Sequence, residues 1–177
     1  MKNLKWLLIA FAMIASSPMS GQANSATSDI GIIINGTRWA TRNVDTSGTF
    51  TRHPENFGRH FTWEQAQNAC PRGWRLPTAN ELESLSSAGS AWGATRNGVN
   101  GRIFGVPPNQ IFIPAAGWIG WNIALSDFVG VGGTYWSGTK HNDELVKALG
   151  FSDIGVLAGF GWTTGDKLSV RCVAITP

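Results

Sequence analysis

Glycine is spread so densely through this chain that it limits what the chain can fold into. The sequence contains 22 glycines in 177 residues. A glycine in a helix interior costs about 1 kcal/mol relative to alanine, which argues against a helical bundle. Charged residues make up only 14% of the sequence, too few for a coiled coil or a charged disordered tail. We therefore predict a loop-rich domain of the α+β class.

The first residues are typical of a targeting signal rather than of folded structure. Lys2 and Lys5 precede a short apolar run at 6–15, and Gly21-Gln22-Ala23 places small residues where a signal peptidase cleaves. The apolar run is about half as long as the roughly 20 residues that a membrane-spanning helix needs. We predict a signal peptide at 1–23, a short linker at 24–28 and one domain at 29–177. The expected location is therefore secreted or at the cell surface, either periplasmic or outside the outer membrane.

Removing this leader changes the meaning of the overall charge. Two of the 14 basic residues, Lys2 and Lys5, belong to the leader, and none of the 11 acidic residues does. The mature chain is therefore close to neutral, without the basic surface that nucleic-acid binding requires. We predict no nucleic-acid partner and no transmembrane segment in the mature chain.

The cysteine content agrees with export. The two cysteines, Cys70 and Cys172, both lie in the mature chain. In an oxidising compartment an even pair of this kind is expected to form a disulfide. The alternative, a reactive thiol or a metal-binding pair, has neither a CxxC spacing nor a nearby histidine in the sequence to support it.

An early hairpin and two short helices can be placed from local signals. Two strand-like runs flank Asn35-Gly36, and an Asn-Gly pair is favoured in hairpin turns because both residues adopt positive φ. Capping boxes at 62–65 and 78–81 each predict the start of a helix. We expect the first helix to extend to about Cys70 and to end at Pro71.

The second half of the chain predicts short strands joined by glycine-rich loops. We expect strands at 111–113, 134–137, 145–151, 154–160 and 168–175. The last of these carries apolar residues on both alternating faces, which indicates a central strand.

Six sequence blocks, taken in order, resemble the signature of one protein family. The blocks are Trp-Ala-Thr-Arg-Asn-Val-Asp (39–45), Cys-Pro-Arg-Gly-Trp-Arg-Leu-Pro-Thr (70–78), Glu-Leu-Glu-Ser-Leu (81–85), Phe-Ile-Pro-Ala-Ala-Gly (112–117), Tyr-Trp-Ser-Gly-Thr (135–139) and Ser-Val-Arg-Cys-Val (169–173). Together they resemble the Fibrobacter succinogenes major paralogous domain family, over essentially all of 30–175.

This resemblance implies a C-type lectin-like fold. Such a fold has two helices, small curled antiparallel sheets and a disulfide from the first helix to the last strand, which Cys70 and Cys172 would form. The family implies export and a role at the cell surface. It implies no defined biochemical activity.

The calcium-binding motifs of C-type lectins are incomplete here. Those lectins use Glu-Pro-Asn or Gln-Pro-Asp together with Trp-Asn-Asp, whereas this chain has Pro-Pro-Asn at 107–109 and Trp-Asn-Ile at 121–123. Because these motifs lack the acidic ligands that Ca²⁺ requires, we predict calcium-independent binding. The acidic cluster at 141–144 is expected to be a solvated turn.

An enzyme is the alternative hypothesis. The segment 74–83 also resembles the formylglycine-generating enzymes, which share a C-type lectin-like core and bind copper through paired cysteines. Both cysteines of this chain are better explained by a disulfide, and His53, His60 and His141 lack the spacing of metal ligands. We expect His53 and His60 to be solvated. No catalytic residue, metal ligand or cofactor is assigned.

The tryptophans divide into a core set and a candidate binding set. Four tryptophans are expected to pack in the core: Trp39, Trp74 and Trp136 of the signature blocks, and Trp63. The stretch that begins at Trp118 is apolar, although the ligand-bearing loop of relatives is expected to be polar. It either closes over the core or forms an exposed interaction patch.

We predict a non-enzymatic binding module that recognises a glycan, a host protein or a fimbrial subunit. A purely structural fimbrial or surface subunit remains a further alternative. The candidate contact residues are Trp118, Trp121, Asn122, Asp127 and Phe128, because indole rings stack on sugars while amides and carboxylates bind hydroxyls.

Overall fold

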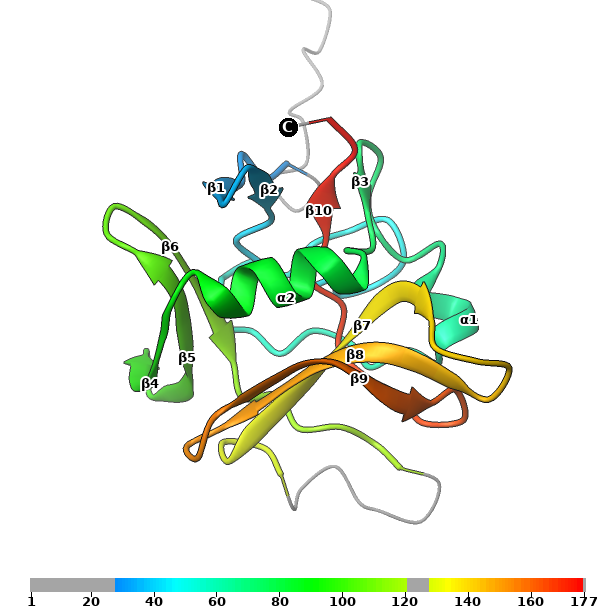
Figure 1. Cartoon of the computed structure of the whole chain (residues 1–177). Coiled ribbons are helices and arrows are strands. Elements are labelled where there is room, and N and C mark those ends of the chain that lie inside the picture. The colour runs from blue at the N-terminus through cyan, green and yellow to red at the C-terminus, as the bar shows by residue number, and fades with distance from the viewer. Residues whose placement is uncertain (1–27, 121–127, 177) are drawn as a thin grey trace, which may run out of the picture.

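The computed structural model describes residues 28–120 and 128–176 (Figure 1). The helices of this part are α1 (Trp63–Ala66) and α2 (Ala79–Ser87). Its strands are β1 (Ile32–Ile34), β2 (Thr37–Trp39), β3 (Trp74–Arg75), β4 (Ser90–Arg96), β5 (Val99–Val106), β6 (Asn109–Pro114), β7 (Gly132–Lys140), β8 (Leu145–Ser152), β9 (Val156–Thr163) and β10 (Val173–Ala174). In the described ranges, no helix is long and apolar enough to span a bilayer.

The strands form three small antiparallel sheets. Their strand orders are β1-β2-β10-β3, β4-β5-β6 and β7-β8-β9. The predicted combination of two helices with small antiparallel sheets is confirmed for the described residues. Figure 1 shows α2 crossing above the β7-β8-β9 sheet, with the β4-β5-β6 sheet to the left of the helix and the β1-β2-β10-β3 sheet above it.

Two hairpins turn at Asn-Gly pairs. The predicted one joins β1 to β2, with φ of 47° at Asn35 and 81° at Gly36. A second hairpin joins β4 to β5 through Asn97 and Gly98, with φ of 49° and 79°. This second hairpin was not predicted from the sequence, although it carries the same turn signal.

Both capping boxes are confirmed, but the first helix is shorter than predicted. The Thr62 and Gln65 side chains each accept from the other residue's backbone N–H, yet α1 ends at Ala66 rather than near Cys70. From Asn68 onward the backbone bonds tighten to three-residue turns. In this geometry the carbonyl of Ala69 accepts from the amide of Gly48 at 2.9 Å, a contact from a distant loop.

The segment 168–172 passes through the centre of the molecule, but it is not the continuous strand that was predicted. Every residue of the segment is buried, and before β10 its pairing is limited to isolated bridges of Leu168 with Phe61 and of Ser169 with Tyr135. Its backbone hydrogen bonds run in turn to Phe61, Thr134, Trp136, Val44 and Ala40. Because its partners come from different elements, the segment joins the sheets rather than extending any one of them.

A buried arginine fixes this central segment. The Arg171 guanidinium donates to Asn43 Oδ1 at 2.9 Å, to the Ala40 carbonyl at 3.1 Å and to the Phe112 carbonyl at 3.3 Å. Burial lowers the pKa of Arg171 to about 10. The neighbouring Tyr135 hydroxyl donates to the Pro114 carbonyl, and burial raises its pKa to about 12.

The disulfide between Cys70 and Cys172 is present. It joins two Cα atoms 6.0 Å apart across a separation of 102 residues. In the chain-entropy model, closing a loop of this length stabilises the fold by up to about 4.7 kcal/mol. The bridge ties the turn after α1 to the residue before β10.

The β7-β8-β9 sheet has a different cover on each face. One face places Tyr135 and Leu149 in a cluster with Leu82 and Leu85 of α2. The other face places Trp136 in a cluster with Phe61 and with the residues around the disulfide. Of the tryptophans expected in the core, Trp39 and Trp136 are buried, while Trp63 and Trp74 pack half-buried against it.

Candidate binding groove

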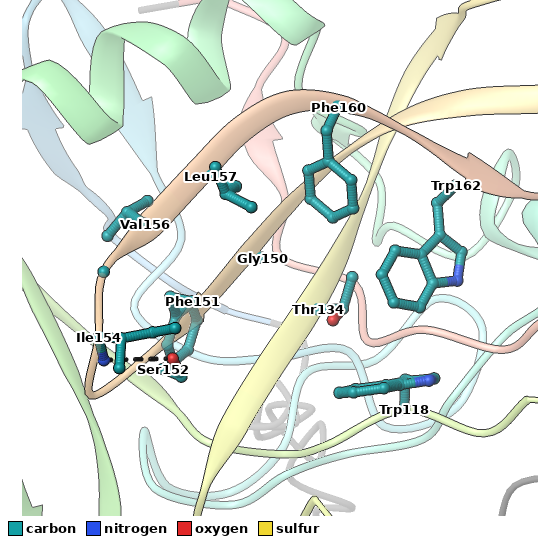
Figure 2. A pocket seen from close by; sticks show the side chains of 11 residues that line it. Trp118, Thr134, Gly150, Phe151, Ser152, Ile154, Val156, Leu157, Phe160 and Trp162 are labelled. Atoms are coloured by element: carbon teal, nitrogen blue, oxygen red, sulfur yellow. Dashed lines mark hydrogen bonds between the residues drawn. The ribbon is translucent and has the colours of Figure 1, made fainter.

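An apolar groove lies on the β7-β8-β9 sheet and is visible in Figure 2. Its volume is about 420 Å³, which is in the range of small-molecule and peptide sites. β9 supplies Val156, Leu157, Phe160 and Trp162, while Trp118 lies across from them.

The strand register places a glycine at the centre of the groove face. Thr134 of β7, Gly150 of β8 and Leu157 of β9 are paired in one row across the sheet, on the face opposite α2. The central position of this row has no side chain. An added Cβ at Gly150 would lie 3.1 Å from two ring carbons of Phe160, which leans over it. The missing side chain therefore lets the Phe160 ring pack directly against β8 at this position.

Aromatic rings define one end of the groove. The ring centroids of Trp118 and Trp162 are 5.3 Å apart at an interplanar angle of 81°, an edge-to-face contact. Phe160 meets Trp162 in the same way at 5.4 Å and 78°. Such pairs contribute about 0.5–1.5 kcal/mol of stabilisation beyond their buried area. The ring contacts therefore stabilise the arrangement of this end of the groove.

Exposed aliphatic side chains define the other end. Ile154, in the turn between β8 and β9, is 94% exposed, and Leu157 is 67% exposed. The turn is closed by hydrogen bonds from the Ser152 amide to the Gly155 carbonyl and from the Ile154 amide to the Ser152 hydroxyl. An aliphatic side chain held outward at a turn tip contributes nothing to the core, so it is available to a partner.

Polar groups are scarce in the groove. Among its described lining residues, side-chain hydroxyls come from Thr134 and Ser152, and no carboxylate, amide or basic side chain contributes. The arrangement can desolvate and hold an apolar group. It offers no general acid or base to a bound molecule.

The predicted contact residues are only partly described. Trp118 and Phe128 lie together, with ring centroids 3.8 Å apart and an interplanar angle of 24°. Phe128 therefore covers one face of the Trp118 indole. Trp121, Asn122 and Asp127 lie outside the described residues.

The β9 side of the groove was missed at the level of sequence. The segment 154–160 was predicted as an ordinary strand, and neither Phe160 nor Trp162 was singled out. Two local signals were available, an isoleucine at a turn tip between Asp153 and Gly155, and aromatic residues on one face of an edge strand. The pairing of this strand with Trp118 depends on tertiary packing, which no local pattern reveals.

His60 was expected to be solvated, and this prediction is wrong. Its Nε2 lies 3.0 Å from the Ala116 carbonyl, and burial lowers its pKa. The backbone next to His60 is fixed, because the following residue, Phe61, pairs with Leu168 of the central segment. The turn at 141–144 is fully exposed, as predicted. Among the described side chains, no group of three or more potential metal ligands converges.

Comparison with known proteins identifies no relative: no family model, no curated protein and no solved structure matches the chain.

Proposed function

We propose that the chain is an exported, non-enzymatic binding module with a C-type lectin-like fold. The proposal combines the leader-like sequence at 1–23, the six family-like sequence blocks and the apolar groove on the β7-β8-β9 sheet. The groove is the observation that carries the binding role, because soluble domains rarely expose linked aromatic and aliphatic side chains without a partner. The protein acts at the cell surface or outside the cell, independently of calcium.

The chemistry of the groove favours a protein partner over a glycan. A sugar presents hydroxyls on every edge, and a sugar site needs amide or carboxylate groups to bind them. Apart from the indole N–H groups of Trp118 and Trp162, the described lining supplies two hydroxyl side chains as its polar side-chain groups. Ile154 and Leu157 suit the aliphatic side chains of a host protein or of a fimbrial subunit. The proposed occupant is therefore an apolar protein segment in an extended or loop conformation.

The disulfide weighs against the enzymatic alternative. An enzyme of the formylglycine-generating type needs two thiol sulfurs to bind copper, and here the sulfurs of Cys70 and Cys172 are bonded to each other. The chain has no further cysteine. Titration of free thiols in the native protein tests this point directly, since two titratable thiols would restore the enzyme hypothesis.

The binding role is tested by selecting ligands for the mature protein from a displayed library of random peptides and from a glycan array. We expect apolar peptides to be enriched and to bind saturably in calorimetry. Leu157→Asp, which places a charge in the groove at an exposed position, is expected to weaken this binding at least tenfold.

Val106→Asp is the matched control. Val106 is 63% exposed, close to the value for Leu157, but it lies on β5, away from the groove. Peptide binding that survives Leu157→Asp unchanged contradicts the assignment of the groove. Enrichment of glycans alone replaces the protein partner with a sugar. Failure of both libraries, together with ordered incorporation into a polymer, would favour the purely structural subunit.

A further inference from the structure

A second hollow, of about 290 Å³, lies beside α1 and has a different chemical character from the groove. It is lined by Ser47, Arg59, His60, Phe61, Gln65 and Lys167. Most of these side chains are polar, and two of them carry a full positive charge. The hollow is separate from the binding groove, so a role for the hollow does not rest on the proposed function.

Backbone hydrogen bonds hold the walls of this hollow. The amide of Arg59 donates to the Val44 carbonyl at 3.1 Å, and the amide of Lys167 donates to the Ile119 carbonyl at 2.8 Å. The Ser47 wall is held through the next residue, Gly48, whose amide donates to the carbonyl of Ala69. Because each wall is fixed by its backbone, the hollow exists before any ligand arrives.

The two cations in the hollow have no counter-charge. Two arginines elsewhere in the described part of the chain are paired, Arg42 with Asp29 and Arg75 with Glu81. Arg59 and Lys167 form no ion pair or side-chain hydrogen bond with any described residue, and no carboxylate lines the hollow. Two like charges that share a concave surface raise the local concentration of anions there.

Neutral hydrogen-bond donors complete the lining. The side-chain oxygen of Gln65 already accepts from the Thr62 amide, which leaves the NH₂ group of Gln65 as a donor. The Ser47 hydroxyl is a further donor. Guanidinium, ammonium, amide and hydroxyl groups around one space match the oxygens of a carboxylate, sulfate or phosphate.

We propose that this hollow is a binding site for an oxyanion group, with Arg59 and Lys167 as its principal ligands. The volume is at the lower limit of small-molecule sites, so it accepts one such group, free or carried by a single acidic sugar, rather than a long polyanion. Both cations are exposed to solvent, so binding is expected to be weak, with a dissociation constant of roughly millimolar order at low salt.

Sulfate, phosphate and glucuronate, each titrated separately into the isotopically labelled mature protein, test this site by amide NMR shifts. We expect saturable shifts at Arg59, His60, Gln65 and Lys167, with glucose as the neutral comparison. Tightest binding of glucuronate points to an acidic sugar, and tightest binding of the inorganic ions points to a free oxyanion. The double variant Arg59→Gln/Lys167→Gln is expected to weaken binding at least tenfold.

Arg72→Gln/Arg96→Gln is the matched control, because it removes two positive charges at exposed positions outside the hollow. It should change the affinity less than twofold. The proposal is overturned if no probe gives saturable shifts at the four residues, or if the control variant loses as much affinity as the double variant. The wild-type shift map is independent of both variants, so a folding defect in either one would not obscure the result.

Discussion

The two faces of the β7-β8-β9 sheet are built from the same strands, but one face is buried and the other carries the groove. On one face α2 packs with residues of β5 and β6 over the sheet, and Leu149 is only 1% exposed. On the other face Trp136 and Ala148 belong to the core cluster around the central segment, whereas Gly150 and Leu157 line the groove. Apolar residues therefore occupy both faces, and they form core where other segments cover them and groove where the described segments do not. Substitutions in the covering segments, 61–70 and 168–172, and on each face of the sheet can test that difference.

Removal of the disulfide is expected to have the largest effect. The double variant Cys70→Ala/Cys172→Ala should lower the free energy of unfolding by about 4 kcal/mol, because the bridge closes a loop of 102 residues. Denaturant unfolding measures the loss. Hydrogen exchange should show weaker protection of the covering segments 61–70 and 168–172, while protection of α2 changes little. Uniform loss of protection would contradict a local role for the bridge.

Truncation of one leucine on each face separates core from groove. Leu149→Ala should cost about 3 kcal/mol, since it leaves a cavity under α2. Leu157→Ala should change stability by less than about 0.5 kcal/mol, because that side chain is 67% exposed. Equal losses in urea unfolding would mean that the groove side of the sheet is as closed as the α2 side.

The smallest expected effect is a pH dependence of stability caused by His60, which immediately precedes Phe61 of the covering segment. Burial lowers its pKa in the folded state below its ordinary value of 6.5. The unfolded chain therefore takes up the proton first, and stability falls as the pH drops below about 6.5 toward the lowered value. Stability measured from pH 8 to pH 5 should show this slope, and His60→Gln should remove it. An unchanged slope in the variant would assign the effect to other groups.

Much of the local structure could be predicted because its signals are local. Asn35-Gly36 specifies its own turn, and Thr78 with Glu81 specifies the start of α2. The same reasoning applied to Asn97-Gly98 would have found the second hairpin. The short α1 could not be predicted from Pro71, since the proline only sets an upper limit, and the tightened turns from Asn68 include a contact of Ala69 with the distant Gly48.

The candidate site was less predictable for the same physical reason. Trp118 was chosen from its position in the chain, and its contact with Trp162 follows from how the sheet packs rather than from any spacing. The positive hollow combines Arg59 and Lys167, which are far apart in sequence and are brought together by the pairing of Phe61 with Leu168. Tertiary pairing of this kind leaves no periodic pattern in the sequence.

The position of Arg171 has a consequence for the timing of folding. Its guanidinium binds the carbonyls of Ala40 and Phe112 and the side chain of Asn43, all of which the ribosome makes earlier. Until the arginine is made, these acceptors lack its hydrogen bonds, so the earlier segments cannot complete their final arrangement during most of synthesis. A chain whose folding waits for its last residues stays unfolded during synthesis, as the proposed export would require.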